Sequence, residues 1–236
     1  MLKIVLTAGH YLGTAGKRCL KSLDPNETRE WVLNNRIADK VEVLLRDYDG
    51  YALLRTDDTT GQTDIDITTR TNAANRFGAD IYLSIHHNAG IYGGKGGGIV
   101  AYTYTKVDDV TREWQKELYD ALIAETGLVG NRATPLATAN LAECRKTTMP
   151  AVLLELGFMD SATDVPVILT EEYADRCARA IVKVLVRRGE LTEKERNIYR
   201  VQVGAYAEKA NAEQMAQRLK AAGFDAFIAE ERVRDE

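Results

Sequence analysis

Short apolar runs, each followed by a polar segment, recur along the first three quarters of this chain. They cover residues 2–6, 51–54, 81–85, 99–104 and 151–156, and runs of this length are typical of strands buried in a parallel sheet. Between them, apolar residues recur at helical spacing, which predicts helices from residue 26 or 28 to 45 and over 67–77, 110–125 and 171–188. Alternating strands and helices predict an α/β fold with a twisted, mostly parallel sheet flanked by helices.

Two segments break this alternation. Residues 93–98 are rich in glycine, but they lack the Gly-Lys-Ser/Thr ending and the following helix of a phosphate-binding loop. We therefore expect a hairpin or a flexible lip there. Residues 134–144 predict a loop or a weak strand.

The pattern changes after residue 189. Residues 190–198 are polar and charged, as in a linker. Beyond them, alternation at 199–203, a helical pattern over 210–222 and alternation at 224–229 predict a small C-terminal β-α-β unit. The predicted organisation is a domain over 1–189, a linker over 190–198 and a partial repeat over 199–236.

The three histidines and one glutamate lie where predicted strands end. His10 follows the first strand, the adjacent His86 and His87 follow the strand at 81–85, and Glu155 lies within the strand at 151–156. Ligand sites in open α/β sheets lie at the carboxyl ends of the strands. Two imidazoles and a carboxylate at that edge predict a metal hydrolase, and an unpaired buried Glu155 would be costly.

Catalytic zinc usually takes three protein ligands and leaves one position open. Glu30 is a natural third ligand because it falls in the first turn of the helix after the first strand, and Glu27 competes for that role. Adjacent residues on a strand point to opposite faces, so only one of His86 and His87 is expected to bind metal. Spacing alone leaves both choices open.

The composition of the chain excludes several classes of partner and site. The 236 residues carry a formal net charge of −4, which argues against nucleic acid as a partner. No apolar run is long enough to predict a membrane span, and residues 1–10 lack the features of a signal peptide. We therefore expect synthesis in the cytoplasm without an export signal. The three scattered cysteines predict small buried side chains, with no disulfide framework or thiolate zinc site.

Several motifs resemble those of the zinc-dependent N-acetylmuramoyl-L-alanine amidases of the type 3 family. The resemblance spans roughly residues 3 to 187. It is carried by Ala8-Gly9-His10, Glu30 with residues 34–38, Thr69-Arg70 with Ala74-Asn75, the Ser-Ile-His-His-Asn-Ala run at 84–89, and the Pro-Ala-Val-Leu-Leu-Glu-Leu-Gly-Phe run at 150–158. One departure is Thr7-Ala8 where the family often has Asp-Pro before Gly-His, and it spares the ligand.

The resemblance implies a zinc ion held by His10, Glu30 and His86, with Glu155 as the general base. It favours Glu30 over Glu27 and His86 over His87. It also implies the substrate, the amide between N-acetylmuramic acid and L-alanine in bacterial peptidoglycan. Arg70 could touch a stem-peptide carboxylate, although a structural ion pair is the favoured role. Alternatives are a zinc hydrolase acting on another amide, and a non-catalytic wall-binding protein.

The C-terminal segment resembles half of a SPOR-type peptidoglycan-binding repeat. The similar residues are Tyr199 to Tyr206, Ala210 to Glu213 and Gly223 to Ala226. A full domain has about two such halves, so a dimer or packing on the amidase domain could complete the sheet. With no export signal, we expect the enzyme to reach the wall only after lysis or release, in sporulation or phage infection.

Overall fold

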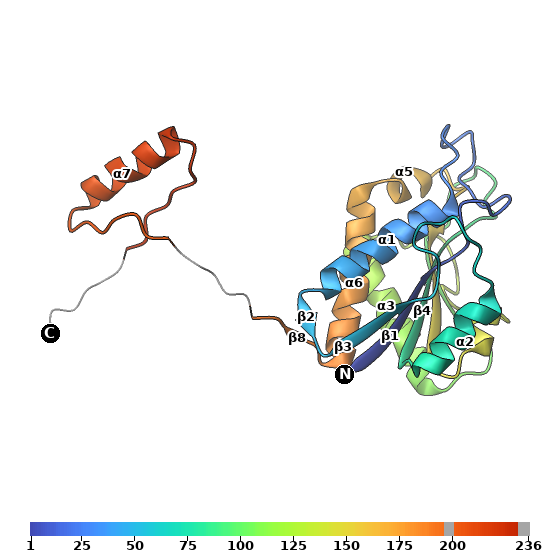
Figure 1. Cartoon of the computed structure of the whole chain (residues 1–236). Coiled ribbons are helices and arrows are strands. Elements are labelled where there is room, and N and C mark those ends of the chain that lie inside the picture. Colours follow the sequence, from blue (N-terminus) through green and yellow to red (C-terminus); the bar gives the residue numbers. More distant parts are fainter. Residues whose placement is uncertain (196–200, 231–236) are drawn as a thin grey trace. The chain divides into compact units, whose positions relative to one another are not determined.

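The computed structural model describes residues 1–195 and 201–230 and divides the chain into two compact units, Met1–Lys194 and Glu195–Glu236. The first unit is an α/β fold (Figure 1). Its strands are β1 (Leu2–Ala8), β2 (Tyr48–Asp49), β3 (Tyr51–Arg55), β4 (Ile81–Asn88), β5 (Ile99–Thr103), β6 (Leu136–Thr138), β7 (Ala151–Phe158) and β8 (Thr192–Glu193). Its helices are α1 (Glu30–Leu45), α2 (Ile67–Phe77), α3 (Asp109–Thr126), α4 (Ala142–Lys146), α5 (Val165–Ile168) and α6 (Glu171–Gly189).

Six strands form one sheet in the order β3-β1-β4-β7-β5-β6. The pairs β3–β1, β1–β4, β4–β7 and β5–β6 are parallel, and only β5 and β7 pair antiparallel. The predicted mostly parallel sheet is confirmed. Its three central strands, β1, β4 and β7, are the ones predicted to carry His10, His86 and Glu155, and they are direct neighbours.

Helices cover both faces of this sheet. Helices α1, α3 and α6 pack on one face, and their apolar residues form the larger core with inward residues such as Leu6, Leu83 and Leu154. Helices α2 and α4 cover the other face, where Ala74 and Cys144 meet Val5, Tyr82 and Leu153. Because strands in such a sheet are buried on both sides, they read as continuous apolar runs in the sequence.

Most helix limits follow from local signals. Helix α2 has the predicted bounds, with Asp66 accepting a hydrogen bond from the Thr69 amide at its start. Gly78 ends it with φ +64°, in the left-handed region that favours glycine. Asp108 and Gly127 frame α3 in the same way. Where the sequence carries caps of this kind, it places helix ends well.

Helix α1 begins later than the sequence indicated. The apolar spacing predicted a start at residue 26 or 28, but the amides of Asn26 and Thr28 donate to the Asp24 carboxylate in the preceding loop. The chain at 28–30 then pairs with 17–19, since the Cys19 amide donates to the Thr28 carbonyl and the Glu30 amide to the Lys17 carbonyl. This pairing delays the helix until Glu30, which becomes its first residue.

Two connections match their predictions only in part. Residues 93–98 do not form a hairpin, because β7 lies between β4 and β5 in the sheet. They form a loop held by two buried carboxylates. Asp160 accepts hydrogen bonds from three successive amides at 90–92, and Asp164 accepts from the amides of Gly98 and Phe158. In residues 134–144, the weak strand is β6, and the sequence reasoning missed the start of α4.

The first unit extends into the segment that the sequence indicated as linker. Leu191 is buried, and β8 pairs antiparallel with β2. Residues 190–194 therefore belong to the fold of the first unit. The three cysteines are free and buried, as predicted.

The second unit contains helix α7 (Lys209–Ala221), followed by Gly223 at φ +86°. The predicted helix is confirmed. The flanking strands are not found in the described residues 201–208 and 222–230, where Val201, Val203, Phe224 and Phe227 are exposed. Tyr199 lies outside the described residues. A strand needs a partner for its backbone groups, and half a repeat supplies few.

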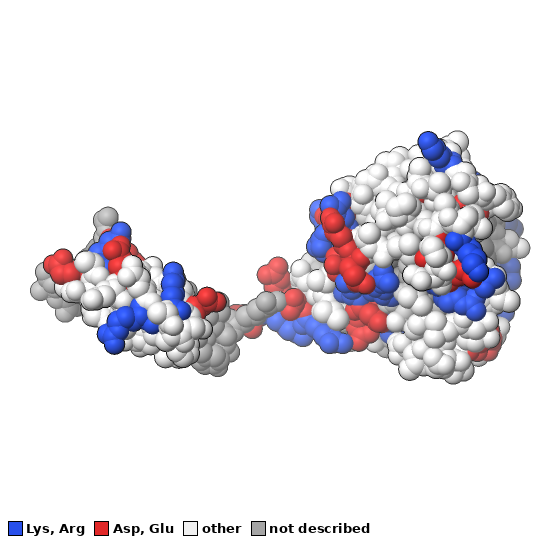
Figure 2. Space-filling model, turned by 90° about the horizontal axis from the view of Figure 1, so that it is seen from above, with Lys and Arg blue, Asp and Glu red and all other residues white. Residues whose placement is uncertain are grey.

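The surface of the chain carries charges of both signs. Acidic and basic side chains lie interleaved on the face seen in Figure 2. Within the described residues, no helix combines the length and hydropathy needed to cross a membrane.

The two bonds made by Asp164 generate a stability prediction. Asp164→Ala leaves the Gly98 and Phe158 amides without an acceptor in the core, so the free energy of unfolding should fall by about 2–4 kcal/mol. Urea denaturation measures this. Asp175→Ala removes only the half-exposed ion pair with Lys40 and should cost less than about 1 kcal/mol. Equal losses in the two variants would contradict the prediction.

Candidate active site

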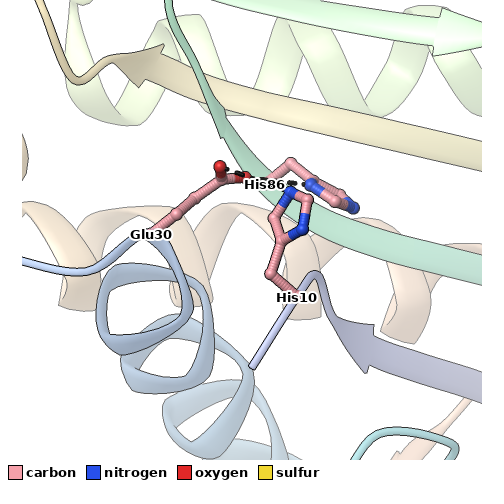
Figure 3. A group of neighbouring side chains, drawn as sticks. All are labelled: His10, Glu30 and His86. Atoms are coloured by element: carbon pink, nitrogen blue, oxygen red, sulfur yellow. Dashed lines mark hydrogen bonds and ion pairs between the residues drawn. The ribbon is translucent and has the colours of Figure 1, made fainter. Parts of the chain in front are cut away.

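Three separate segments bring His10, Glu30 and His86 together (Figure 3). His10 lies two residues beyond β1, Glu30 opens α1, and His86 lies on β4. Each side chain offers one potential ligand atom, and these atoms lie within 4.8 Å of one another. The structure therefore brings together the three residues expected to hold a metal.

Glu30 is the centre of this group. Its side chain is fully buried, with Oε1 3.0 Å from Nδ1 of His86 and Oε2 3.4 Å from Nε2 of His10. The Nζ atom of Lys17 also lies 3.4 Å from Oε2, and the His87 amide donates to Oε1. Burial alone would raise the pKa of Glu30, but bonds and charges from the two histidines lower it well below its usual value. The carboxylate is therefore ionised and can act as a ligand.

The backbone at His10 is held by Arg70. This buried guanidinium donates to the carbonyls of Ala8, His10 and Ile65 and to the Thr7 hydroxyl. His10 itself has φ +66°, a left-handed conformation that costs free energy in a residue other than glycine. Arg70 thus has a structural role, through backbone carbonyls rather than through the expected ion pair.

His86 and His87 point to opposite faces of β4. The ring of His87 is buried, and its Nδ1 lies 2.8 Å from Oδ1 of Asn34. Asn34 in turn donates to the Gly9 carbonyl. Burial lowers the pKa of His87 to about 3, so this ring is neutral. His87 ties β4 to α1 and to the end of β1, while His86 faces Glu30.

Gly9 makes room for the His86 ring. A Cβ atom at this position would lie 2.0 Å from Cε1 of His86 and 2.4 Å from its Nδ1. Any side chain at position 9 would therefore displace the imidazole. The glycine before His10 is required by a residue on the neighbouring strand.

Glu27, the competing third ligand, lies elsewhere. Its carboxylate pairs with Arg18 at 3.2 Å and with Lys21 at 3.8 Å. Its backbone has φ +50°, in the loop that precedes α1. Glu27 contributes to the shape of this loop.

Glu155 lies on β7, directly opposite His86 in the strand register. Its Oε2 atom is buried and has no hydrogen-bond partner among residues 1–195 and 201–230. Burial raises the pKa of Glu155 to about 7, against the lowering effect of the nearby His86 charge. A carboxyl group with this pKa can both accept and release a proton near neutral pH.

Sequence reasoning missed a third acidic residue near this group. Glu143 on α4 is buried, accepts a 2.5 Å hydrogen bond from the Ser84 hydroxyl, and lies 3.7 Å from Nε2 of His86. Burial lowers the pKa of His86, but Glu143 and Glu30 outweigh this and raise it to about 10. Glu143 follows no apolar run, so neither strand ends nor motifs drew attention to it.

The donor set fits zinc. Oε2 of Glu30 is buried and ionised, yet it accepts no hydrogen bond from the part of the chain that the structure describes, and its two nearest cationic partners, His10 and Lys17, lie 3.4 Å away. Two imidazoles and one carboxylate form a ligand set found in catalytic zinc sites. The arrangement can bind a metal beside a proton acceptor, which is the chemistry of a metal-dependent hydrolase.

Comparisons with known proteins agree with this chemistry. The family described as N-acetylmuramoyl-L-alanine amidase matches residues 4–187, and the SPOR domain matches residues 178–235. The N-acetylmuramoyl-L-alanine amidase CwlM of Bacillus licheniformis is 33% identical over 97% of this chain and 85% of its own length. The sporulation-specific N-acetylmuramoyl-L-alanine amidase of Bacillus subtilis is 31% identical, over 97% and 84% respectively. An endolysin of Bacillus phage SPP1 is 30% identical, over 78% and 67%.

Solved structures share the fold. The catalytic domain of CwlV, an amidase from Bacillus (Paenibacillus) polymyxa var. colistinus, superposes with a TM-score of 0.71 at 23% identity, over 81% of this chain and 100% of that domain. The amidase from Clostridium difficile 630 superposes with a TM-score of 0.70 at 24% identity, over 80% of this chain and 97% of that chain. The match over residues 4–187, together with relatives aligned along nearly the whole chain, shows that the chain belongs to the N-acetylmuramoyl-L-alanine amidase family.

Proposed function

We propose that this amidase is a zinc enzyme in which His10, Glu30 and His86 hold the metal and Glu155 is the general base. The observation that carries the proposal is the convergence of three ligand atoms within 4.8 Å on the buried Glu30, with Glu155 opposite His86. The bond cleaved is the amide between the lactyl group of N-acetylmuramic acid and L-alanine. The reaction releases a carboxylate on the sugar and the free amine of L-alanine.

In the proposed reaction, Glu155 transfers the proton and Glu30 holds the metal. When bound, zinc supplies Lewis acidity that polarises the scissile carbonyl and acidifies water. Glu155, as carboxylate, accepts a proton from the attacking water at its unpartnered Oε2. It then donates this proton to the leaving nitrogen as the amide bond breaks. Glu30 keeps its charge throughout, because His10, His86 and Lys17 surround it.

The second unit is proposed to hold the enzyme on the wall. The SPOR match and the exposed Val201, Phe224 and Phe227 support this role. Binding would raise the local concentration of substrate without changing the chemical step. The unpaired segments beside α7 could also pair with a second copy of the chain, which would make the enzyme a dimer.

The relatives suggest the biological setting. One is named as sporulation-specific, and another is a phage endolysin. By this likeness we propose that the enzyme degrades walls during lysis or release of a cell.

Replacing the histidines tests the zinc site. His86→Ala should abolish zinc retention and amidase activity, because it removes one of three ligands. His87→Gln should keep zinc, since His87 faces Asn34 and the core. Metal analysis of the purified proteins, with circular dichroism to verify folding, measures this. If folded His87→Gln lost zinc while His86→Ala retained it, the ligand assignment would be wrong.

Replacing Glu155 tests the general base. Glu155→Gln should retain zinc but lower kcat by roughly 10² or more, because the amide cannot accept the proton. Release of new amino termini from soluble muropeptides measures the rate. A variant that turns over at the normal rate would point to another base.

A stability measurement provides the control for folding. Burial raises the pKa of Glu155 to about 7 in the folded, metal-free chain, whereas in the unfolded chain it lies near its ordinary value of 4.5. The unfolded chain thus releases this proton first, and the wild-type protein loses stability as pH rises from 4.5 to 7. Metal-free Glu155→Gln should lack this loss and be the more stable protein at pH 8 in urea denaturation.

Truncation tests the second unit. A chain ending at Glu195 keeps Leu191 and β8, and it should therefore retain zinc and full activity on soluble muropeptides. Its binding to whole sacculi in a pelleting assay should be weaker than that of the full chain. Unchanged sacculus binding would mean that this unit has no role in attachment. Light scattering of both proteins shows whether it also forms a dimer.

A further inference from the structure

Glu143 is a buried acid without a role in the mechanism so far described. It lies on the short helix α4, with only 5% of its surface exposed. Burying a carboxylate is costly unless hydrogen bonds or charges compensate. Such a residue persists most readily where the site needs its charge.

The surroundings of Glu143 identify what it faces. Its Oε2 accepts the Ser84 hydroxyl and lies 3.7 Å from Nε2 of His86. On the opposite side of the same imidazole, Nδ1 lies 3.0 Å from Oε1 of Glu30. The His86 ring therefore lies between two buried carboxylates, one at each nitrogen.

The Nε2 atom of His86 needs an acceptor. It is buried and has no hydrogen-bond partner in the described part of the chain. An imidazole that binds metal through one nitrogen carries its proton on the other, and that N–H requires an acceptor. The nitrogen turned toward Glu30 is Nδ1, which leaves the proton on Nε2, facing Glu143. A shift of about half an ångström would bring this pair to hydrogen-bond distance.

We propose that Glu143 is a positioning residue that accepts the Nε2 proton of His86 and so holds Nδ1 toward the metal. The carboxylate fixes the tautomer and the orientation of the ring and strengthens it as a ligand. Ser84 holds the carboxylate in place from the same strand that carries His86. The inference rests on the zinc ligands proposed above, and it assigns Glu143 no contact with the metal or the substrate.

The test measures zinc affinity in the full-length protein by competition with a chromophoric chelator. Removing an acceptor of this kind typically weakens metal binding 10- to 100-fold, so Glu143→Ala should raise the Kd for zinc by about that factor. Glu143→Gln keeps an oxygen that can accept the proton but lacks the charge, and it should recover part of the affinity. The visible absorption spectrum of the cobalt-substituted enzyme should differ from that of the wild type more in Glu143→Ala than in Glu143→Gln.

Cys144→Ala is the matched control. It disturbs the packing of the neighbouring buried residue on α4 without touching His86, so the Kd for zinc should stay within about threefold of the wild-type value. A loss equal to that in Glu143→Ala would show that α4 packing, not the acceptor, sets the affinity. If Glu143→Ala fails to fold, the Kd of Glu143→Gln for zinc tests the proposal: a raised Kd supports it, and the wild-type Kd overturns it.

Two failures are distinguishable. If the wild-type chain binds no zinc, or His86→Ala binds it normally, the proposed metal site is wrong. If the wild-type chain binds zinc, His86→Ala does not, and folded Glu143→Ala has the wild-type Kd and cobalt spectrum, only the role of Glu143 is overturned.

Discussion

The buried charge of Glu30 governs the arrangement of this amidase. A carboxylate removed from solvent must be balanced by cations or donors, and here these come from distant parts of the chain. His10 follows β1, His86 lies on β4, and Lys17 reaches in from the loop before α1. The backbone pairing between 17–19 and 28–30 fixes Glu30 at the point where all three can reach it. Without these partners the carboxylate would be too costly to bury, and the ligand set would not assemble.

The parallel register of the sheet places this charge near Glu155, the proposed general base. Because β1, β4 and β7 run side by side in the same direction, the polar residues near their carboxyl ends meet at one edge. His86 and Glu155 are partners in the register of β4 and β7, so their separation is set by strand spacing. The geometry of the proposed catalytic site is therefore set by the backbone more than by flexible side chains.

Much of this could be predicted from sequence. The apolar runs located the five long strands, and apolar residues at helical spacing located α2 and α3. Positions at strand ends gave His10, Glu155 and the pair of His86 and His87, and the first turn of a helix gave Glu30 as a candidate beside Glu27. The family motifs then favoured His86 and Glu30. Other features depend on contacts between distant segments. Helix α1 starts at Glu30 because of pairing with residues 17–19, which no local signal encodes. Glu143 reaches His86 only through the packing of α4 against α2 and β7. In the described residues 201–208 and 222–230, the segments beside α7 form no strands.

Gly9 shows how an absence of atoms can be part of a site. The space for the His86 imidazole exists because the neighbouring chain carries only a hydrogen at that point. Introducing the two histidines and the glutamate into another protein with a parallel sheet would thus fail if that protein had a side chain at the position of Gly9. A search for similar centres gains discrimination if it requires this empty volume as well as the three ligands.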